Sequence, residues 1–352
     1  MPATALEETL AKHRAFWERK PAKKPLLSVN PDRVLKPVEM ELADGSPVKE
    51  DMYLTPDLLD PKRMLELEEF PPRPRSEPDK PGAVAGDVLV IRSPLNKMCW
   101  VEAVLGCRVH VRATSGSVYS EPYLKGPDEL SRIPSIKDNA WLKLLQSYTR
   151  ALAQNARGRY YVPVTLMRGT IDLVAAVLGY DKMALAIYDQ PRQLRKLTER
   201  CVESFLAVAD AQHAESPSLQ GGRVTPYGVW APGTFIKSQC DASAAISAKT
   251  YEQFFMPYEI DIYKRYQHSN VHLHSGYLHT VDVFLKTEYP TSMQVSLDTG
   301  STPETVHTLM PVFKKVLAKK PLFITGPMTR AELDELLTLP TAGLMIGAYL
   351  MD

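Results

Sequence analysis

The sequence lacks the features that define several large protein classes. It has no run of 18 apolar residues, so it predicts no membrane-spanning helix. Its four cysteines form no C-x-x-C pair and show no zinc-ribbon or disulfide-framework spacing. Neither G-x-G-x-x-G nor G-x-x-x-x-G-K-[ST] occurs, which predicts no nucleotide cofactor. The charged N-terminus does not read as a secretory signal, so we expect a protein of the reducing cytoplasm.

An excess of one charge is also missing. Lys and Arg number 42 and Asp and Glu number 41, which gives a net charge of +1. Proteins that bind nucleic acid usually carry a basic excess or stripe. The hydrophobic fraction of 44% is ordinary for a folded protein. The composition therefore predicts a small-molecule partner, with no nucleic acid and no membrane.

Proline is concentrated near the N-terminus. Of the 29 prolines, 13 lie between Pro21 and Pro94. Proline lacks an amide hydrogen and disfavours helix at the preceding residue, so this region should be irregular with short extended pieces. We interpret residues 1–20 as a helix and 21–95 as a covering or lid segment, with a disordered linker as the alternative.

From about residue 139, short apolar runs alternate with amphipathic stretches. Strands are predicted at Tyr160–Leu166 and Arg223–Val229, and a long helix at Pro191–Glu215. Ser247 is a suitable N-cap for the helix that follows it. The remaining chain then reads as four strands separated by helices, the strands being NVHLHS, SMQVSL, PLFITG and AGLMIG.

This alternation predicts a parallel sheet with right-handed crossovers. A (β/α)8 TIM-type barrel with a Pro-rich N-terminal extension fits the spacing and the length. The expected units are residues 1–95, a helix and covering segment, and residues 96–352, the barrel. One feature departs from that pattern, because the chain stops at Asp352 where a barrel normally adds a closing helix.

Two histidines and a carboxylate are the main candidates for chemistry. His272 and His274 share one face of a predicted strand, because strand side chains alternate with a period of two. Asp298 follows the next strand, and in barrels of this kind the site lies at the C-terminal ends of the strands. The set suits a divalent metal such as zinc, acid–base catalysis, or hydrogen-bonded structural roles.

Five further residues are candidates for substrate binding. Tyr227 and Trp230 lie in a rigid Pro- and Gly-containing loop, where aromatic rings stack on a flat ligand or simply close the core. Arg168 could hold a substrate carboxylate, and Lys237 could orient a charged group. Asp241 precedes a helix, so it suits an N-cap as well as a ligand contact.

Several segments resemble the uroporphyrinogen decarboxylase superfamily. The stretch PLNKMCWVEAVLGCRVHV resembles its E-A-x-x-G-C region. The block WAPGTFIKSQCDASAAISAKTYEQFFMPY, the strand end HLHSG and the segment GPMTRAELDEL follow in the family's order. The resemblance spans about residues 94–350. It implies a (β/α)8 barrel whose members are tetrapyrrole decarboxylases, or methyltransferases that work with corrinoid proteins and thiols.

The chain also departs from both branches of that superfamily. The N-terminal R-Q-A-G-R element of the decarboxylases is absent, and the position of their essential Asp reads Asn96-Lys97-Met98-Cys99. The thiol methyltransferases use H-x-C and a distant Cys as zinc ligands. Here those positions read His272-Leu273-His274 and Gly343–Ala348, so both cysteines are replaced. A harder His/His/Asp set would suit a donor oxygen.

Three functions follow from the sequence. The preferred one is metal-assisted methyl transfer from a small oxygenated or aromatic donor to a corrinoid on a partner protein, with His272, His274 and Asp298 as catalytic or metal-binding residues. The first alternative is decarboxylation of a tetrapyrrole or other carboxylate, clamped by Arg168, Lys97 and Lys237. The second is a non-catalytic ligand-binding barrel. By family analogy we also expect a homodimer.

Overall fold

The computed structural model describes most of the chain. The described residues are 5–30, 41–67, 84–95, 98–112, 117–298 and 305–351. The densest part of the proline cluster, residues 71–81, lies outside them, as does Lys97. The lid interpretation of residues 21–95 therefore stays a prediction.

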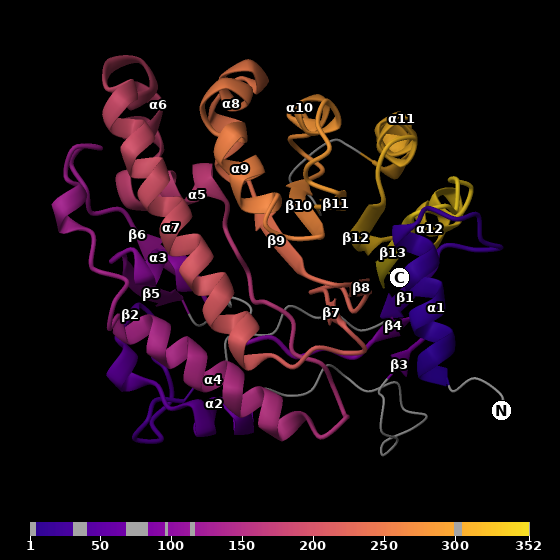
Figure 1. Cartoon of the computed structure of the whole chain (residues 1–352), viewed down its shortest axis with the longest axis horizontal. Helices are drawn as coiled ribbons and strands as arrows, with labels where there is room; N and C mark the ends of the chain where they lie inside the picture. Colours follow the sequence, from indigo (N-terminus) through magenta and orange to yellow (C-terminus); the bar gives the residue numbers. More distant parts are fainter. Residues whose placement is uncertain are drawn as a thin grey trace.

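A six-stranded parallel sheet organises the C-terminal half of the protein (Figure 1). Its order is β1-β13-β12-β11-β10-β9, and each neighbouring pair is parallel. The strands are β1 (Leu26–Asn30), β9 (Phe235–Gln239), β10 (His268–His274), β11 (Ser292–Ser296), β12 (Leu322–Met328) and β13 (Leu344–Leu350). The four strands predicted from the C-terminal alternation are thus confirmed as β10 to β13.

Helices connect these strands and cover the outer face of the sheet, as Figure 1 shows for α8 to α12. The connecting helices are α8 (Ala248–Phe254), α9 (Met256–Tyr263), α10 (Val281–Leu285), α11 (Val306–Leu317) and α12 (Arg330–Leu336). Ser247 caps α8 as predicted, since its side chain accepts the amide hydrogen of Thr250. The single helix predicted after Ser247 is instead divided at Phe255, because Pro257 lies in the first turn of α9 and cannot donate a helical hydrogen bond.

Further helices and a small antiparallel sheet pack beside the central sheet. These elements are α2 (Pro61–Leu67), α3 (Trp100–Val104), α4 (Ala140–Ala156), α5 (Thr170–Leu178), α6 (Tyr180–Asp189) and α7 (Pro191–Glu215), with β2 (Met52–Leu54), β5 (Arg108–Arg112) and β6 (Ser117–Glu121). The predicted bounds of α7 are confirmed. One hydrophobic core joins residues from both predicted units, such as Leu54, Met64 and Leu197. The division at residue 95 is not tested by these contacts.

Two predicted strands differ from the structure. Residues 162–168 are irregular, and only Tyr161 forms a bridge, to Ile91. Pro163 has no amide hydrogen for a ladder, and the Thr165 amide donates to the Gln212 side chain at 2.8 Å instead of to a strand. Gly169 N–H does bond Gln239 O of β9, at 2.8 Å. The described strands therefore form a six-stranded parallel sheet within an α/β fold, without the eight-strand closure that the sequence predicts.

The second difference concerns residues 223–229. Only their first two residues are extended, in β7 (Gly222–Val224), which pairs antiparallel with β8 (Trp230–Pro232). The hairpin lies outside the parallel sheet because its two strands bond to each other. Its loop carries Tyr227 toward the interior, where the ring packs on Phe323 with 4.8 Å between centroids.

The N-terminal helix α1 (Ala5–Trp17) covers the N-terminal end of the sheet. Phe16 contacts Phe323 edge-on with 4.9 Å between ring centroids, and Trp17 packs near Phe235 at 6.1 Å. Phe235 and Phe323 lie at the beginnings of β9 and β12. In Figure 1, α1 stands beside β1 and the C-terminus. A helix from the N-terminus thus lies beside β1, which pairs with the last strand, β13.

His13 of α1 makes the stability of this packing pH-dependent. Its Nδ1 accepts the Trp230 amide hydrogen at 2.9 Å, and its Nε2 bonds to Asp87 O at 2.7 Å. Both bonds require the neutral ring with a proton on Nε2. Burial lowers the pKa of His13 to about 4, against the effects of the Asp87 hydrogen bond and charge.

We expect the free energy of unfolding to fall by about 3 kcal/mol as the pH drops from 6.5 to 4. In this range His13 binds a proton in the unfolded chain but stays neutral in the folded protein. Above pH 6.5 this contribution is fully present. His13→Gln keeps one acceptor and one donor but does not titrate. Urea unfolding at pH 7 and pH 4.5 should show a smaller acid loss for the variant than for the wild type; equal losses would contradict this assignment.

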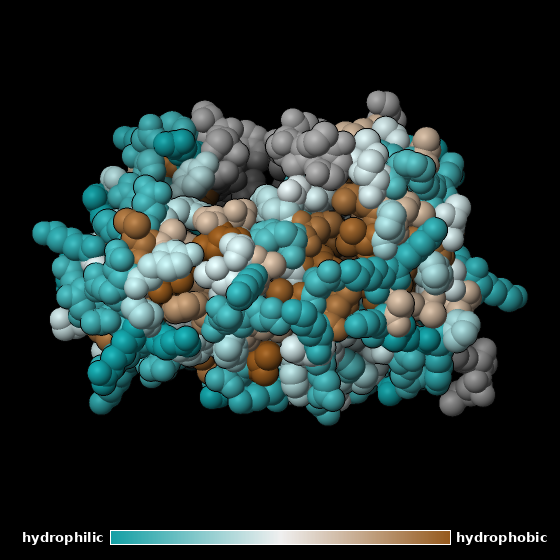
Figure 2. All heavy atoms as spheres, turned by 90° about the horizontal axis from the view of Figure 1, so that it is seen from above, coloured by the Kyte–Doolittle hydropathy of each residue, from teal (hydrophilic) through white to brown (hydrophobic). Residues whose placement is uncertain are grey.

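The described helices include none that is long and apolar enough to span a membrane. Seen from above, hydrophilic side chains cover most of the surface, and hydrophobic residues show mainly in the depressions between them (Figure 2). Among the described large hydrophobic residues, the three most exposed are all on α6: Tyr180, Leu185 and Tyr188.

Candidate metal centre

Strand β10 presents the two candidate histidines on one face. Val271 and Leu273 are buried in the hydrophobic core, so the alternating residues His272 and His274 point to the opposite face of the sheet. In register, His272 lies between Gln239 of β9 and Gln294 of β11. The period-two prediction that both imidazoles share a face is confirmed.

Gln294 fixes the tautomer of His272. Its Oε1 accepts a hydrogen bond from His272 Nδ1 and another from the Tyr227 hydroxyl at 3.0 Å. Its Nε2 donates to Thr325 Oγ1 at 2.6 Å. With the amide in this orientation its oxygen only accepts, so His272 Nδ1 carries the proton and His272 Nε2 has the lone pair.

Asp298 fixes the tautomer of His274 in the same way. Its Oδ1 lies 2.7 Å from His274 Nδ1, and its backbone amide donates to Ser275 Oγ at 3.1 Å. A carboxylate at Nδ1 holds the proton there and leaves the lone pair on Nε2. Asp298, predicted as a metal ligand, thus lies behind His274, on the far side of the ring from His274 Nε2.

The Nε2 atoms of the two rings face each other. His272 Nε2 and His274 Nε2 are 3.1 Å apart, which is a hydrogen bond when one of them carries a proton and a pair of facing lone pairs when both protons are on Nδ1. Asp241 Oδ2 is 3.7 Å from His274 Nε2, and one ligand atom from each of the three residues fits within 4.8 Å. Two zinc–nitrogen bonds in tetrahedral geometry would separate the nitrogens by about 3.3 Å. The donor set therefore fits a divalent metal.

Asp241 is oriented by its neighbours and lacks a partner on one oxygen. It begins a short 3-10 helix, η3 (Asp241–Ala245), without capping it by its side chain. Gln239 Nε2 donates to Asp241 Oδ2. Asp241 Oδ1 is buried and has no hydrogen-bond partner within the described structure. Burial raises the pKa of Asp241, so binding of a cation there would favour the ionised form.

A second buried carboxyl group supports this loop. Asp172 Oδ1 accepts the Ala242 amide hydrogen at 2.7 Å. Its Oδ2 has no partner among the described residues. Burial raises the pKa of Asp172 well above its usual range, and the neighbouring Asp241 charge adds to that effect. Sequence reasoning missed Asp172 because a lone Asp in an apolar helix start reads as an N-terminal charge.

The site favours the neutral form of His272 and leaves the neighbouring side chains partly exposed. Burial lowers the pKa of His272 well below its usual range, with further lowering by Lys237 and His274. A neutral imidazole is the form that binds a metal. The side chains of His274, Asp241 and Asp298 remain 25%, 29% and 21% exposed, so a ligand can reach them from solvent.

The predicted substrate cations have different environments. Arg168 donates to Glu102 at 2.6 Å, and this carboxylate raises the pKa of Arg168. Its guanidinium is therefore already neutralised by the protein. Lys237 lies on β9 beside Asn270 of β10, in the same interior as His272, and its ammonium is 5.4 Å from the centre of the Tyr227 ring.

The predicted aromatic pair is divided. Tyr227 lies beside the site and donates to Gln294, as described above. Trp230 is 1% exposed and packs toward α1, with its indole donating to Leu219 O at 2.7 Å and Arg14 over its ring at 5.2 Å. Trp230 thus contacts α1, and of the two aromatic residues only Tyr227 reaches the site, through its hydrogen bond to Gln294.

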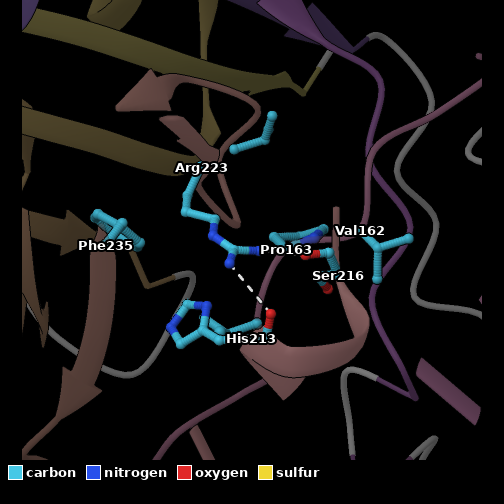
Figure 3. Close-up of a pocket in the computed structure, with 8 residues that line it drawn as sticks. Val162, Pro163, His213, Ser216, Arg223 and Phe235 are labelled. Carbon is cyan, nitrogen blue, oxygen red and sulfur yellow. Dashed lines mark hydrogen bonds between the residues drawn. The ribbon is translucent and has the colours of Figure 1, made fainter. Parts of the chain in front are cut away.

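A small cavity lies at the opposite end of the sheet (Figure 3). It has a volume of about 10 Å³ and is lined by His213, Ser216, Arg223 and Phe235 among others. Arg223 donates to His213 O at 3.1 Å. That volume suits one water molecule, and Phe235 is the first residue of β9. The cavity is too small for an organic substrate.

Gln294 is a site residue that was not predicted from the sequence, although the sequence contains a signal for it. It occupies the inward-facing position of SMQVSL that aligns with His272, and a polar residue in an apolar strand is a signal that could have identified it. The carboxylate at Asp241 and the amide at Gln239 are two residues apart along the chain, on the neighbouring strand end.

Removal of the Tyr227 hydroxyl tests its positioning role. Tyr227→Phe deletes the donor to Gln294 Oε1 and to Asn270 Oδ1, while the ring still packs on Phe323. We expect a loss of about 1 kcal/mol in unfolding free energy and weaker metal binding by a few fold, measured by urea titration and by competition with a chelator. A variant with unchanged metal affinity would confine Tyr227 to a packing role.

Comparison with known proteins supports the fold alone. No family model matches the chain, and none of the curated proteins matches it. A solved methyltransferase from Methanosarcina mazei is similar in structure, with a TM-score of 0.59 and 12% sequence identity, over 97% of this chain and 93% of that one. The shared α/β architecture extends over nearly the whole chain, whereas the resemblance to the uroporphyrinogen decarboxylase superfamily stays a prediction from the sequence.

Proposed function

We propose that this protein is a metal-dependent methyltransferase that removes a methyl group from a small oxygenated or aromatic donor. One observation carries the proposal: His272 Nε2 and His274 Nε2 face each other at 3.1 Å, with a carboxylate of Asp241 beside them. Two imidazole nitrogens and a carboxylate are a donor set that a divalent cation takes, provided both rings carry their protons on Nδ1.

His272, His274 and Asp241 would hold the metal, most suitably zinc. Bound there, zinc would supply Lewis-acid polarisation of the oxygen that carries the methyl group. Gln294 and Asp298 keep the protons of both imidazoles on Nδ1, so their task is to present the two Nε2 atoms. Nitrogen and carboxylate ligands are harder than thiolates, which favours an oxygen donor over a thiol.

The architecture is consistent with this proposal. The methyltransferase from Methanosarcina mazei shares the fold, and we propose that the six-stranded sheet corresponds to part of a (β/α)8 barrel, with irregular segments near Tyr161 and Ile91 in the two remaining positions. The methyl acceptor in this proposal is a corrinoid carried by a partner protein. The cytoplasmic location and a homodimer stay predictions.

Decarboxylation, the first alternative, gains no support from the site. A substrate with many carboxylates needs several free cations to offset the loss of hydration. Arg168 is paired with Glu102, and Asp241 and Asp298 add negative charge beside the imidazoles. Lys237 is the single cation of this group with no carboxylate partner among the described residues.

Two measurements test the proposed function. Elemental analysis of the untagged protein should find close to one zinc per chain. Incubation with reduced cobalamin and a panel of methyl ethers should then show the spectral change of cobalamin methylation, dependent on that zinc. Zinc-free protein that cannot be loaded would overturn the metal centre, and loaded protein that methylates cobalamin from none of the donors would favour a ligand-binding role.

A further inference from the structure

Lys237 differs from the other buried lysines and arginines among the described residues. Arg92 donates to the carbonyl of Leu65 at 2.6 Å. Lys320 donates to the carbonyls of Thr287 at 2.9 Å and Glu288 at 3.0 Å. Lys237 is only 7% exposed, yet within the described part of the chain its ammonium makes neither a hydrogen bond nor an ion pair. A buried charge without a partner is costly, and burial lowers the pKa of Lys237 to about 8; a ligand of opposite charge would offset that cost.

The position of Lys237 places it in the site. It precedes Gln239 by two residues on β9 and pairs in register with Asn270, two residues before His272 on β10. Its charge lowers the pKa of His272, and the Asp241 charge opposes the effect of burial on Lys237 itself. The ring of Tyr227 closes one side, 5.4 Å from Nζ. The ammonium therefore lies near the metal ligands, on the interior side of them.

The charges around Lys237 and the histidines limit which ligands can bind at the site. Asp241 and Asp298 are the carboxylates in contact with His274, and Lys237 is the uncompensated cation. A divalent metal held by the histidines and Asp241 would leave this group with one net positive charge. One negative charge on a ligand would balance the site.

We propose that Lys237 is the anion-binding residue of this site and that its ligand is a small monocarboxylate. This inference rests on the proposed function and deepens it: the methyl donor carries a carboxylate as well as its methylated oxygen. A single ammonium without a guanidinium fork or a second free cation suits one carboxylate better than a phosphate dianion. The carboxylates of Asp241 and Asp298 beside His274 further disfavour a polyanion.

The test measures carboxylate binding directly, by isothermal titration of acetate and benzoate into zinc-loaded protein at pH 7, with inorganic phosphate as a third ligand. Lys237→Met keeps the length of the side chain and removes the charge. Lys249→Met, on the exposed surface of α8, is the matched control. We expect at least ten-fold weaker carboxylate binding in Lys237→Met and wild-type binding in the control.

Thermal unfolding separates this role from a structural one. Removing an uncompensated buried charge should leave the melting temperature unchanged or raise it. A lower melting temperature, carboxylate binding equal to that of the wild type, or tighter binding of phosphate than of either carboxylate would overturn the inference.

The outcomes also separate this inference from the proposed function. Carboxylate binding that is lost in Lys237→Met, without any methyl transfer by the wild type, would leave the anion site standing and overturn only the function. If the wild type transfers methyl groups but its carboxylate affinity does not depend on Lys237, the proposed function would stand and the anion site would be overturned.

Discussion

His272→Ala should lose bound zinc and methyl transfer together while the fold persists. The variant removes one of two facing nitrogen ligands, and the remaining His274 and Asp241 cannot complete a stable site. Gln294 Oε1 keeps the Tyr227 hydroxyl as a donor, so no buried acceptor is left without a partner and the stability cost should stay near 1 kcal/mol. We expect less than a tenth of the wild-type zinc content and a rate reduced by at least about a thousand-fold.

His279→Ala is the matched control for that experiment. His279 is exposed and contacts the carbonyl of Ile246 at 3.2 Å, outside the facing pair. It should retain zinc and activity. Full activity in His272→Ala, with circular dichroism showing a native fold in both variants, would contradict the metal centre.

The second prediction with a large effect compares Asp298, which orients His274, with Asp241, the proposed metal ligand. In Asp298→Asn, the amide NH2 can donate to His274 Nδ1 and so favours a proton on Nε2, where it would block metal binding. We expect zinc affinity to fall by about 10- to 100-fold. In Asp241→Asn a ligand oxygen is replaced by a neutral, weaker one, so the loss should be larger.

Chelator competition on both variants decides between these roles. If Asp298 were the ligand, as the sequence alone suggested, its variant would lose more zinc affinity than Asp241→Asn does. Asp298→Glu provides a rescue test, because a carboxylate that still reaches His274 Nδ1 should restore the tautomer and recover part of the affinity. A purely structural role for Asp298 would lower the melting temperature in both Asp298 variants without this order of affinities.

These predictions depend on features that the sequence determined by itself. Alternation of apolar and polar residues is a local property, so it placed β10 to β13 in a parallel sheet and set His272 and His274 on one face. The hydroxyl of Ser247 ahead of a helical stretch likewise marked the start of α8. Such signals survive because backbone geometry repeats every two or 3.6 residues whatever surrounds it.

The tertiary structure alone decided how the site is assembled. Strand register brings Gln294 against His272, and the loop after β9 brings Asp241 in front of His274 Nε2 while Asp298 lies behind the ring. Which of the two carboxylates faces His274 Nε2 depends on packing between segments that lie 24 and 33 residues from His274 along the chain, and no local pattern encodes it. The same reason explains Trp230: its loop is local, but the docking of α1 from the other end of the chain determines what the indole contacts.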